Sequence, residues 1–177
     1  FTILGGEVFT YNEKVWGPIL EQFLNNPDVI SSIVTNGSLL TPDIVDKYWG
    51  ALKKYYFSID SLDPNIYKEI RKIDLKNTLK NMTYIINKAR KLGEPNPIDC
   101  IIAVLMAKNL HTMPQLLQTC IDLGIPTIMF HPLVGPLRGT EEDIVGLNLN
   151  VRMNVYNQIE QIMKNNKNKI YIKNGGL

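Results

Sequence analysis

Tyr56-Phe57-Ser58-Ile59-Asp60-Ser61-Leu62-Asp63-Pro64 combines an apolar run, alternating polar residues and a helix start within a few positions. An acidic cap followed by proline, as in Asp63-Pro64, is typical of the first turn of a helix. A parallel strand that is buried on both faces is apolar along its length, so Ser58 and Asp60 fit only at its carboxyl end, facing a ligand. The segment therefore predicts one strand–helix unit of a ligand-binding α/β sheet.

Short apolar runs alternate with helical periods along the rest of the chain, which is typical of successive βα units on a parallel sheet. The expected strands cover residues 1–4, 29–35, 55–60, 98–107 and 126–131, and a weaker one covers 170–172. No linker divides the sequence, so we expect a single domain over residues 1–177. A Pro/Gly-rich loop at 132–139 is long and polar enough to be functional.

The first expected helix has apolar residues three to four positions apart, which places them on one face. These are Val15, Ile19, Leu20, Phe23 and Leu24. A second helix opens at Thr41-Pro42-Asp43, and Gly93 provides a left-handed stop for the longest one.

Composition narrows the class of protein. The 177 residues are 45% hydrophobic and carry a net charge of +2, which favours one core and gives no sign of a nucleic-acid surface. Small molecules or proteins are therefore the expected partners. No apolar run approaches the roughly 20 residues of a membrane span, and no signal leader is present, so we expect a cytoplasmic protein without membrane contact.

Cys100 and Cys120 each lie in an apolar run, where free cysteine behaves as a small buried hydrophobe in a reducing compartment. The chain begins with Phe1 in a strand-like run, and we expect it to be the middle of a longer protein. The unpaired strand edge at residues 1–4 would then favour pairing with another chain, including self-association.

The candidate site follows from the rule that ligands bind outside the carboxyl ends of parallel strands. It consists of Gly5-Gly6-Glu7, Thr35-Asn36-Gly37, Ser58 with Asp60, Asn109 and His131. The glycines permit close approach of the backbone, and the Glu7 carboxylate suits an ammonium group. An ordinary tight turn with a solvated glutamate is the alternative interpretation.

Ser58 and Asp60 lie two residues apart and share one side of their strand, where they suit a carboxylate and ribose hydroxyls. Alternatively, Asp60 caps the following helix and Ser58 only fills space. Arg71 offers a bidentate fork for a carboxylate, although a solvated surface charge is the common role of a helical arginine. His131 suits an adenine or a substrate, or is structural.

Taken in order, these segments resemble the radical S-adenosylmethionine (radical SAM) superfamily over roughly residues 1–136. The resemblance is carried by Leu4-Gly5-Gly6-Glu7, by Val34-Thr35-Asn36-Gly37, and by the segment from Ser58 to Pro64 with Arg71. It implies a partial (β/α)₆ TIM-like barrel of parallel strands without its first βα unit. It is most similar to the branch that includes molybdenum-cofactor, peptide-modifying and sulfatase-maturing enzymes, so the substrate is a small molecule or a peptide.

In that family S-adenosylmethionine chelates a [4Fe-4S] cluster and is cleaved to a 5′-deoxyadenosyl radical. The resemblance assigns the methionine amino group to Gly6 and Glu7, with Gly5 beside them, and its carboxylate to Ser58 and Arg71. It also assigns the ribose to Asp60 and the adenine to the backbone from Met129 to His131; Asn109 completes the expected cofactor-binding set.

Two features depart from the family pattern. The Cys-x-x-x-Cys-x-x-Cys loop and its strand are absent, and Val8 stands where the family has proline. A cluster needs thiolate ligands, and Cys100 and Cys120 are too widely spaced and too embedded to provide them. We therefore expect the cluster only in a full-length protein with upstream cysteines, and we expect this chain alone to be inactive.

Two other classes fit the same residues. One is a cluster-less relative that uses the barrel to bind a peptide or a nucleotide-like ligand. The other is an ordinary α/β barrel enzyme in which Ser58 and Asp60 face a phosphorylated or sugar substrate.

Overall fold

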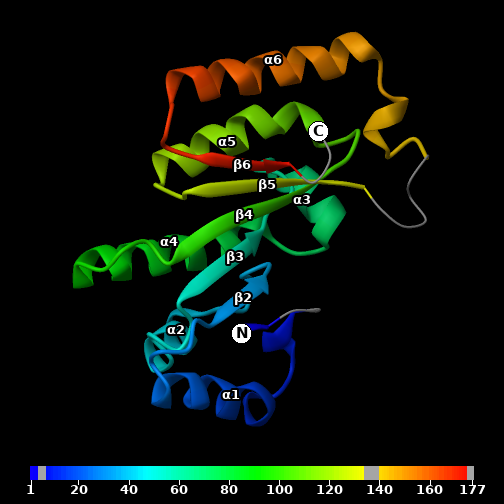
Figure 1. Cartoon of the computed structure of the whole chain (residues 1–177). Helices are drawn as coiled ribbons and strands as arrows, with labels where there is room; N and C mark the ends of the chain where they lie inside the picture. The colour runs from blue at the N-terminus through cyan, green and yellow to red at the C-terminus, as the bar shows by residue number, and fades with distance from the viewer. Residues whose placement is uncertain (4–6, 134–139, 175–177) are drawn as a thin grey trace. The chain divides into compact units, whose positions relative to one another are not determined.

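The computed structural model describes residues 1–3, 7–133 and 140–174, in two compact units (Figure 1). The first unit combines Phe1–Ser58 with Ile73–Asp99, and the second combines Ile59–Lys72 with Cys100–Leu177. All registered strand pairs are parallel, and the strands follow chain order within each unit. This confirms the expected parallel α/β fold, while the single domain stays a prediction.

The first unit carries three parallel strands and their helices. Its elements are β1 (Thr2–Ile3), η1 (Val8–Thr10), α1 (Glu13–Asn25), β2 (Ser32–Thr35), α2 (Pro42–Lys47), β3 (Lys54–Ser58) and α4 (Leu75–Leu92). Helix α4 starts where the Asp74 side chain accepts a hydrogen bond from the Lys76 amide. It ends at Gly93, whose φ of 71° is left-handed as expected.

Helix α1 corrects one prediction. Val15 and Ile19 were expected on its buried face, but they are 58% and 44% exposed. The helix instead buries Trp16 and Leu20, because the Trp16 ring packs edge-on between Phe9 and Tyr48 at centroid distances of 5.0 and 5.6 Å. This aromatic cluster sets the rotation of α1 about its axis.

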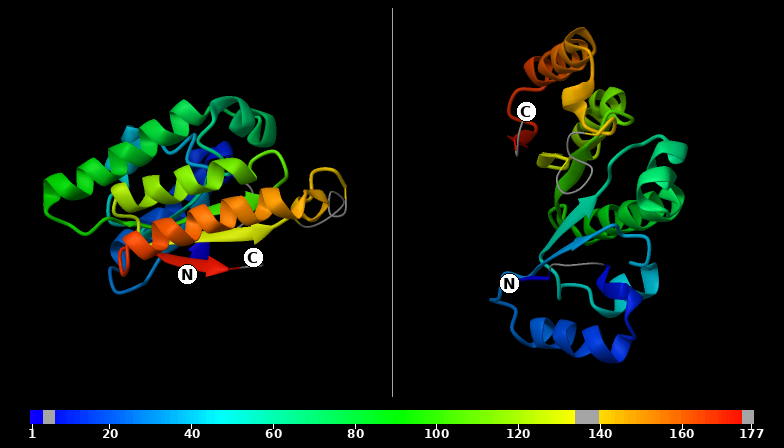
Figure 2. Two further views of the ribbon diagram at one scale, coloured as in Figure 1. Left: turned by 90° about the horizontal axis from the view of Figure 1, so that it is seen from above. Right: turned by 90° about the vertical axis from the view of Figure 1, so that its right-hand side faces the viewer.

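The second unit also carries parallel strands in chain order. Its elements are α3 (Pro64–Arg71), β4 (Ile98–Leu105, whose first two residues belong to the first unit), η2 (Leu110–Thr112), α5 (Met113–Asp122), β5 (Thr127–Pro132), η3 (Ile144–Gly146), α6 (Leu149–Asn165) and β6 (Tyr171–Asn174). Helices α5 and α6 lie side by side along one face of β5 and β6 (Figures 1 and 2).

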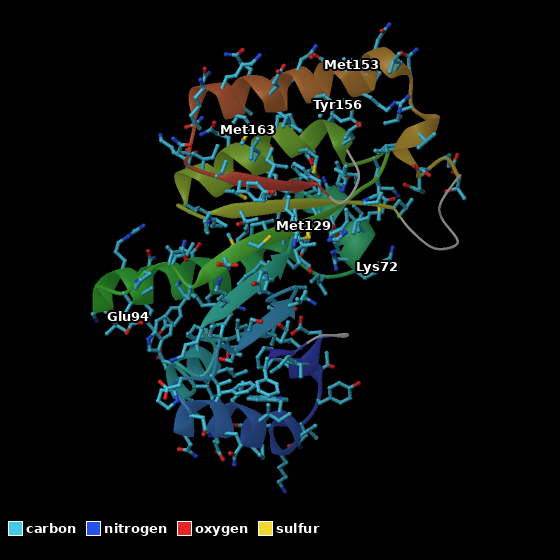
Figure 3. The ribbon with its side chains drawn as sticks, in the orientation of Figure 1. Lys72, Glu94, Met129, Met153, Tyr156 and Met163 are labelled. Atoms are coloured by element: carbon cyan, nitrogen blue, oxygen red, sulfur yellow. The ribbon has the colours of Figure 1, made fainter. Side chains whose placement is uncertain are left out.

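The strands of this unit alternate between two faces. Ala103 and Phe130 are fully buried, whereas Val104, Met129 and His131 are only half-buried. Register pairs Val104 with His131, so these two residues share the less covered face, on which Met129 also lies (Figure 3). That face is open enough to meet a ligand.

Several strands are shorter than expected. Strand β2 begins at Ser32 rather than residue 29, because the Val29 amide closes a turn onto Asn26. Strand β4 stops at Leu105 rather than 107, because the Met106 amide donates to the Asn109 side chain. Among the described residues, no helix is both long and apolar enough to cross a membrane.

Candidate ligand-binding site

Glu7 is fixed at the carboxyl end of β2. Its carboxylate oxygens lie 2.8 and 2.7 Å from the Thr35 hydroxyl, which donates to them, and the Asn36 amide donates to Oε2 at 2.9 Å. Gly5 and Gly6, which were expected to share this site, fall outside the described residues. The carboxylate therefore has a defined position, and its role toward a ligand stays a prediction.

The turn after β2 supports this carboxylate. The Gly37 amide donates to the Thr35 hydroxyl oxygen at 2.8 Å, and Asn81 Nδ2 donates to the carbonyls of Gly37 and Ser38 at 2.8 and 3.1 Å. Gly37 has a φ of 72°, and a Cβ there would lie 2.1 Å from the Phe57 ring. Only glycine fits such a position.

Sequence reasoning missed Asn81. A signal existed, because Asn81 falls on the buried stripe of α4 beside Met82 and Ile85, where an amide needs a partner. The partner itself, a turn more than 40 positions away, was not readable from the sequence.

Ser58 ends β3 and is buried within the first unit. Its position at a carboxyl end agrees with the expectation, and its role toward a ligand stays a prediction.

Asp60 is buried in the second unit with only 1% of its surface exposed. One carboxylate oxygen accepts a hydrogen bond from Arg71 Nε, and the other accepts one from the Val104 amide at 2.8 Å. Asp63, not Asp60, caps α3, through the amides of Asn65 and Ile66. The capping alternative is therefore wrong for Asp60, and Arg71 is not a merely solvated charge.

Asn109 uses its side chain within the protein. Its amide nitrogen donates to the carbonyls of Asp60 and Val104 at 2.7 and 2.8 Å, and its oxygen accepts from Met106. Both amide protons are thus occupied. Asn109 positions the backbone on which Asp60 lies, and direct contact with a cofactor stays a prediction.

A hydroxyl pair extends this network. Thr112 Oγ1 donates to the Asn109 carbonyl at 2.8 Å, so in its 3.1 Å contact with Ser61 it acts as the acceptor. The Ser61 oxygen in turn accepts from the Asp63 amide. Neither residue was singled out from the sequence.

A cavity of about 300 Å³ opens beside the Asp60–Arg71 pair, within the size range of small-molecule sites. Its lining consists of Asp60, Ile70, Arg71, Val104, Met106 and Leu133. His131 is not part of that lining, but it is the register partner of Val104. The cavity combines apolar walls with one partly buried ion pair, which suits a mostly apolar ligand with a few polar groups.

Lys108 was also missed. Its Nζ lies 2.5 Å from Glu69 Oε1 and 2.6 Å from Glu142 Oε1, and hydrogen bonds to Glu142 and Glu69 raise its pKa. The Ala107 amide also donates to the Glu142 carbonyl. These contacts hold the segment around Glu142 against the end of β4.

The described residues do not fit an iron–sulfur cluster. Across residues 1–3, 7–133 and 140–174, no three His, Cys, Asp or Glu side chains gather as a metal site requires. Cys100 and Cys120 are free and buried, and burial raises the pKa of the Cys120 thiol to about 12. A thiol with that pKa is a poor source of thiolate at neutral pH.

Successive parallel βα units with polar groups at the strand ends define an α/β fold of the kind that binds ligands at that edge, and solved structures show which fold it is. SuiB from Streptococcus suis matches with a TM-score of 0.69 and 16% identity over 99% of this chain, and SuiB bound to S-adenosylmethionine with 0.67. A domain of pyruvate-formate lyase-activating enzyme from Bacteroides vulgatus matches with 0.62 and 14% identity, over 99% of this chain and 98% of its own.

At 14–16% identity, these matches show that the chain shares the fold of these solved structures. It spans about two fifths (39%) of the length of SuiB. No protein-family model and no curated protein matches the sequence, so the likeness is one of structure.

Proposed function

We propose that this chain is the S-adenosylmethionine-binding core of a radical SAM enzyme. Support comes from the fold, which also occurs in anSMEcpe with bound AdoMet at a TM-score of 0.62 over 97% of this chain. At 14% identity, that likeness concerns the fold alone. The assignment of the ligand therefore rests on the chemistry of this chain's own side chains.

Glu7 is the observation that carries the proposal. A carboxylate accepts about four hydrogen bonds, and Thr35 has one proton to share between the two oxygens. With the Asn36 amide as the second donor, capacity remains for the methionine ammonium group. Gly5 and Gly6 are assigned to the same group, because glycine allows the ligand to approach the backbone.

The remaining roles are assigned to residues of the second unit. Arg71 is assigned to the methionine carboxylate, since an arginine that uses Nε for Asp60 keeps other N–H donors. Asp60 is assigned to the ribose, and Asn109 to its positioning. The cavity beside Val104 and the neighbouring His131 are assigned to the adenine.

The bound nucleoside would supply a reactive alkyl radical, and that chemistry requires a [4Fe-4S] cluster. Because the described residues do not fit a cluster, we place its cysteine ligands in a part of the protein outside this chain. The chain alone then binds S-adenosylmethionine without cleaving it. Its own residues hold and orient the nucleoside.

A peptide is the substrate class that we favour. SuiB has been solved with its precursor peptide SuiA, and anSMEcpe with AdoMet and the Cp18Cys peptide. The half-buried face around Met129 offers this chain an apolar surface for such a substrate.

The test is binding of S-adenosylmethionine to this chain, measured by calorimetry and by the rise in Tm that native-state binding causes. Glu7→Gln keeps the size of the side chain but removes the charge that pairs with an ammonium. It should weaken binding about tenfold to a hundredfold, the usual value of a charged hydrogen bond. Glu21→Gln, on the exposed surface of α1, is the matched control and should bind like the wild type.

Failure of the wild-type chain to bind at millimolar S-adenosylmethionine would contradict the proposal, as would equal affinity of the Glu7→Gln variant. Circular dichroism of both variants shows whether the fold is retained. If the nucleoside fails to bind while a peptide binds, the chain is instead the cluster-less binding module.

A further inference from the structure

A second cavity, of about 360 Å³, lies in the first unit at the amino end of β3. The residues that line it are Trp49, Gly50, Leu52, Lys53, Tyr55, Glu94, Pro95, Asn96 and Pro97. None of them is assigned to S-adenosylmethionine above. They come from the segment between α2 and β3, from β3 itself and from the segment between α4 and β4, and Figure 3 shows Glu94 at the end of α4.

The Tyr55 hydroxyl is the unusual group in this cavity. Tyr55 is only 2% exposed, and its side chain makes no hydrogen bond to any residue that the structure describes. Burial alone raises its pKa, with no hydrogen-bond partner contributing. The hydroxyl is unpaired but not sealed off, because among the described residues only Arg152 Nε is an enclosed side-chain atom without a partner. The Tyr55 hydroxyl therefore remains available to a hydrogen-bonding group from outside the protein.

The walls are held in place by other contacts. Trp49 Nε1 donates to Glu94 Oε2 at 3.1 Å, and Lys88 Nζ lies 5.2 Å from the centroid of the Trp49 ring. The Tyr55 amide donates to the Pro97 carbonyl at 2.9 Å. An aromatic wall fixed in this way loses little conformational entropy when a ligand binds.

We propose that this cavity binds a small planar aromatic molecule that carries a hydrogen-bond acceptor. The flat apolar surfaces of Trp49, Pro95 and Pro97 suit a ring, and aromatic pairs gain from stacking as well as from burial. The Tyr55 hydroxyl donates to the acceptor. The volume lies within the range of small-molecule sites.

Quinoline is the probe, because it combines a flat bicyclic ring with a single ring-nitrogen acceptor. Titration of the isotope-labelled chain should shift the backbone amide signals of residues 49–55 and 94–98. Tyr55→Phe removes only the hydroxyl and should weaken quinoline binding about three- to tenfold, the usual contribution of one hydrogen bond. Tyr171→Phe removes an exposed hydroxyl from β6 and should leave the affinity unchanged.

A stability measurement separates this proposal from a structural role of the hydroxyl. If the hydroxyl has no protein partner, Tyr55→Phe leaves the free energy of unfolding unchanged or raises it, while quinoline binding weakens. A marked loss of stability, equal quinoline affinity in Tyr55→Phe, or shifts confined to other residues would each overturn the proposal. The S-adenosylmethionine titration involves none of these residues, so each proposal can fail without the other.

Discussion

At the scale of single residues, Asn109 connects more backbone groups than any other side chain discussed above. Asn109→Ala leaves the Asp60 and Val104 carbonyls and the Met106 amide without their partner. Because these groups are buried or partly buried, we expect a loss of about 2–4 kcal/mol in the free energy of unfolding. Urea denaturation followed by circular dichroism measures it.

Asn165→Ala is the matched control, since Asn165 is exposed near the end of α6 and accepts one hydrogen bond from Gln161. It should change stability by less than about 0.5 kcal/mol. Similar losses in the two variants would show that Asn109 does not have the structural role that its contacts indicate.

The positions of the site residues in their elements were partly predictable from the sequence. Thr35 and Ser58 end β2 and β3, as the polarity change at the end of each apolar run predicts, whereas Asp60 lies beyond the end of β3. Their partners were not predictable. The Asp60–Arg71 pair depends on how the end of α3 turns back toward Asp60, and no periodic pattern encodes that path.

At the scale of elements, Gly93 tests the end of α4. It has a φ of 71°, and a Cβ there would meet nothing within 4 Å. Gly93→Ala should therefore cost only the backbone strain of the left-handed conformation, about 1 kcal/mol in unfolding free energy. Urea midpoints of the variant and the wild type give this difference.

Gly146→Ala provides the comparison, because its Cβ also meets nothing within 4 Å but its φ is not in the left-handed region. It should leave stability unchanged or raise it slightly. Equal losses at both positions would mean that something other than the dihedral angle is responsible.

Helix ends were predictable because caps and left-handed stops depend on the conformation of one or two residues, as Gly93 illustrates. Asp63 caps α3 through its side chain and Pro64 begins that helix, whereas Thr41 precedes α2 without a side-chain capping bond. The buried face of α1 was not predictable, because Val15 and Trp16 are both apolar and only tertiary packing selects between them. The predicted strands were too long, because a strand ends where a turn interrupts its hydrogen bonds and not where the apolar run ends.

At the scale of the whole molecule, the two units carry different chemistry. The first unit provides a carboxylate at a strand end, and the second provides a partly buried ion pair beside a cavity. Both involve polar residues near the carboxyl ends of parallel strands, and the backbone matches solved structures although no family model and no curated protein matches the sequence. The fold therefore determines the strand ends at which polar residues can face a ligand, while the surrounding sequence can vary.

Stability of the whole molecule should depend on pH through Cys120. Burial raises its pKa from 9.0 to about 12 in the folded chain, so folding favours the protonated thiol. The stabilisation is complete below pH 9 and is lost as the pH rises toward 12, because only the unfolded chain releases the proton. Within that window, one group lowers the unfolding free energy by at most about 1.4 kcal/mol per pH unit.

Cys120→Ser isolates this contribution, because serine does not titrate in the same range while tyrosines and lysines titrate in both proteins. Urea denaturation at about pH 8, 9 and 10 should show the wild type losing stability faster than the variant, with a difference that grows above pH 9. The variant has lower stability at pH 8, since it buries a hydroxyl, so the slope and not the absolute value is compared. Parallel curves would mean that the Cys120 thiol titrates alike in the folded and unfolded chains, and that its surroundings in the second unit are less apolar than the structure shows.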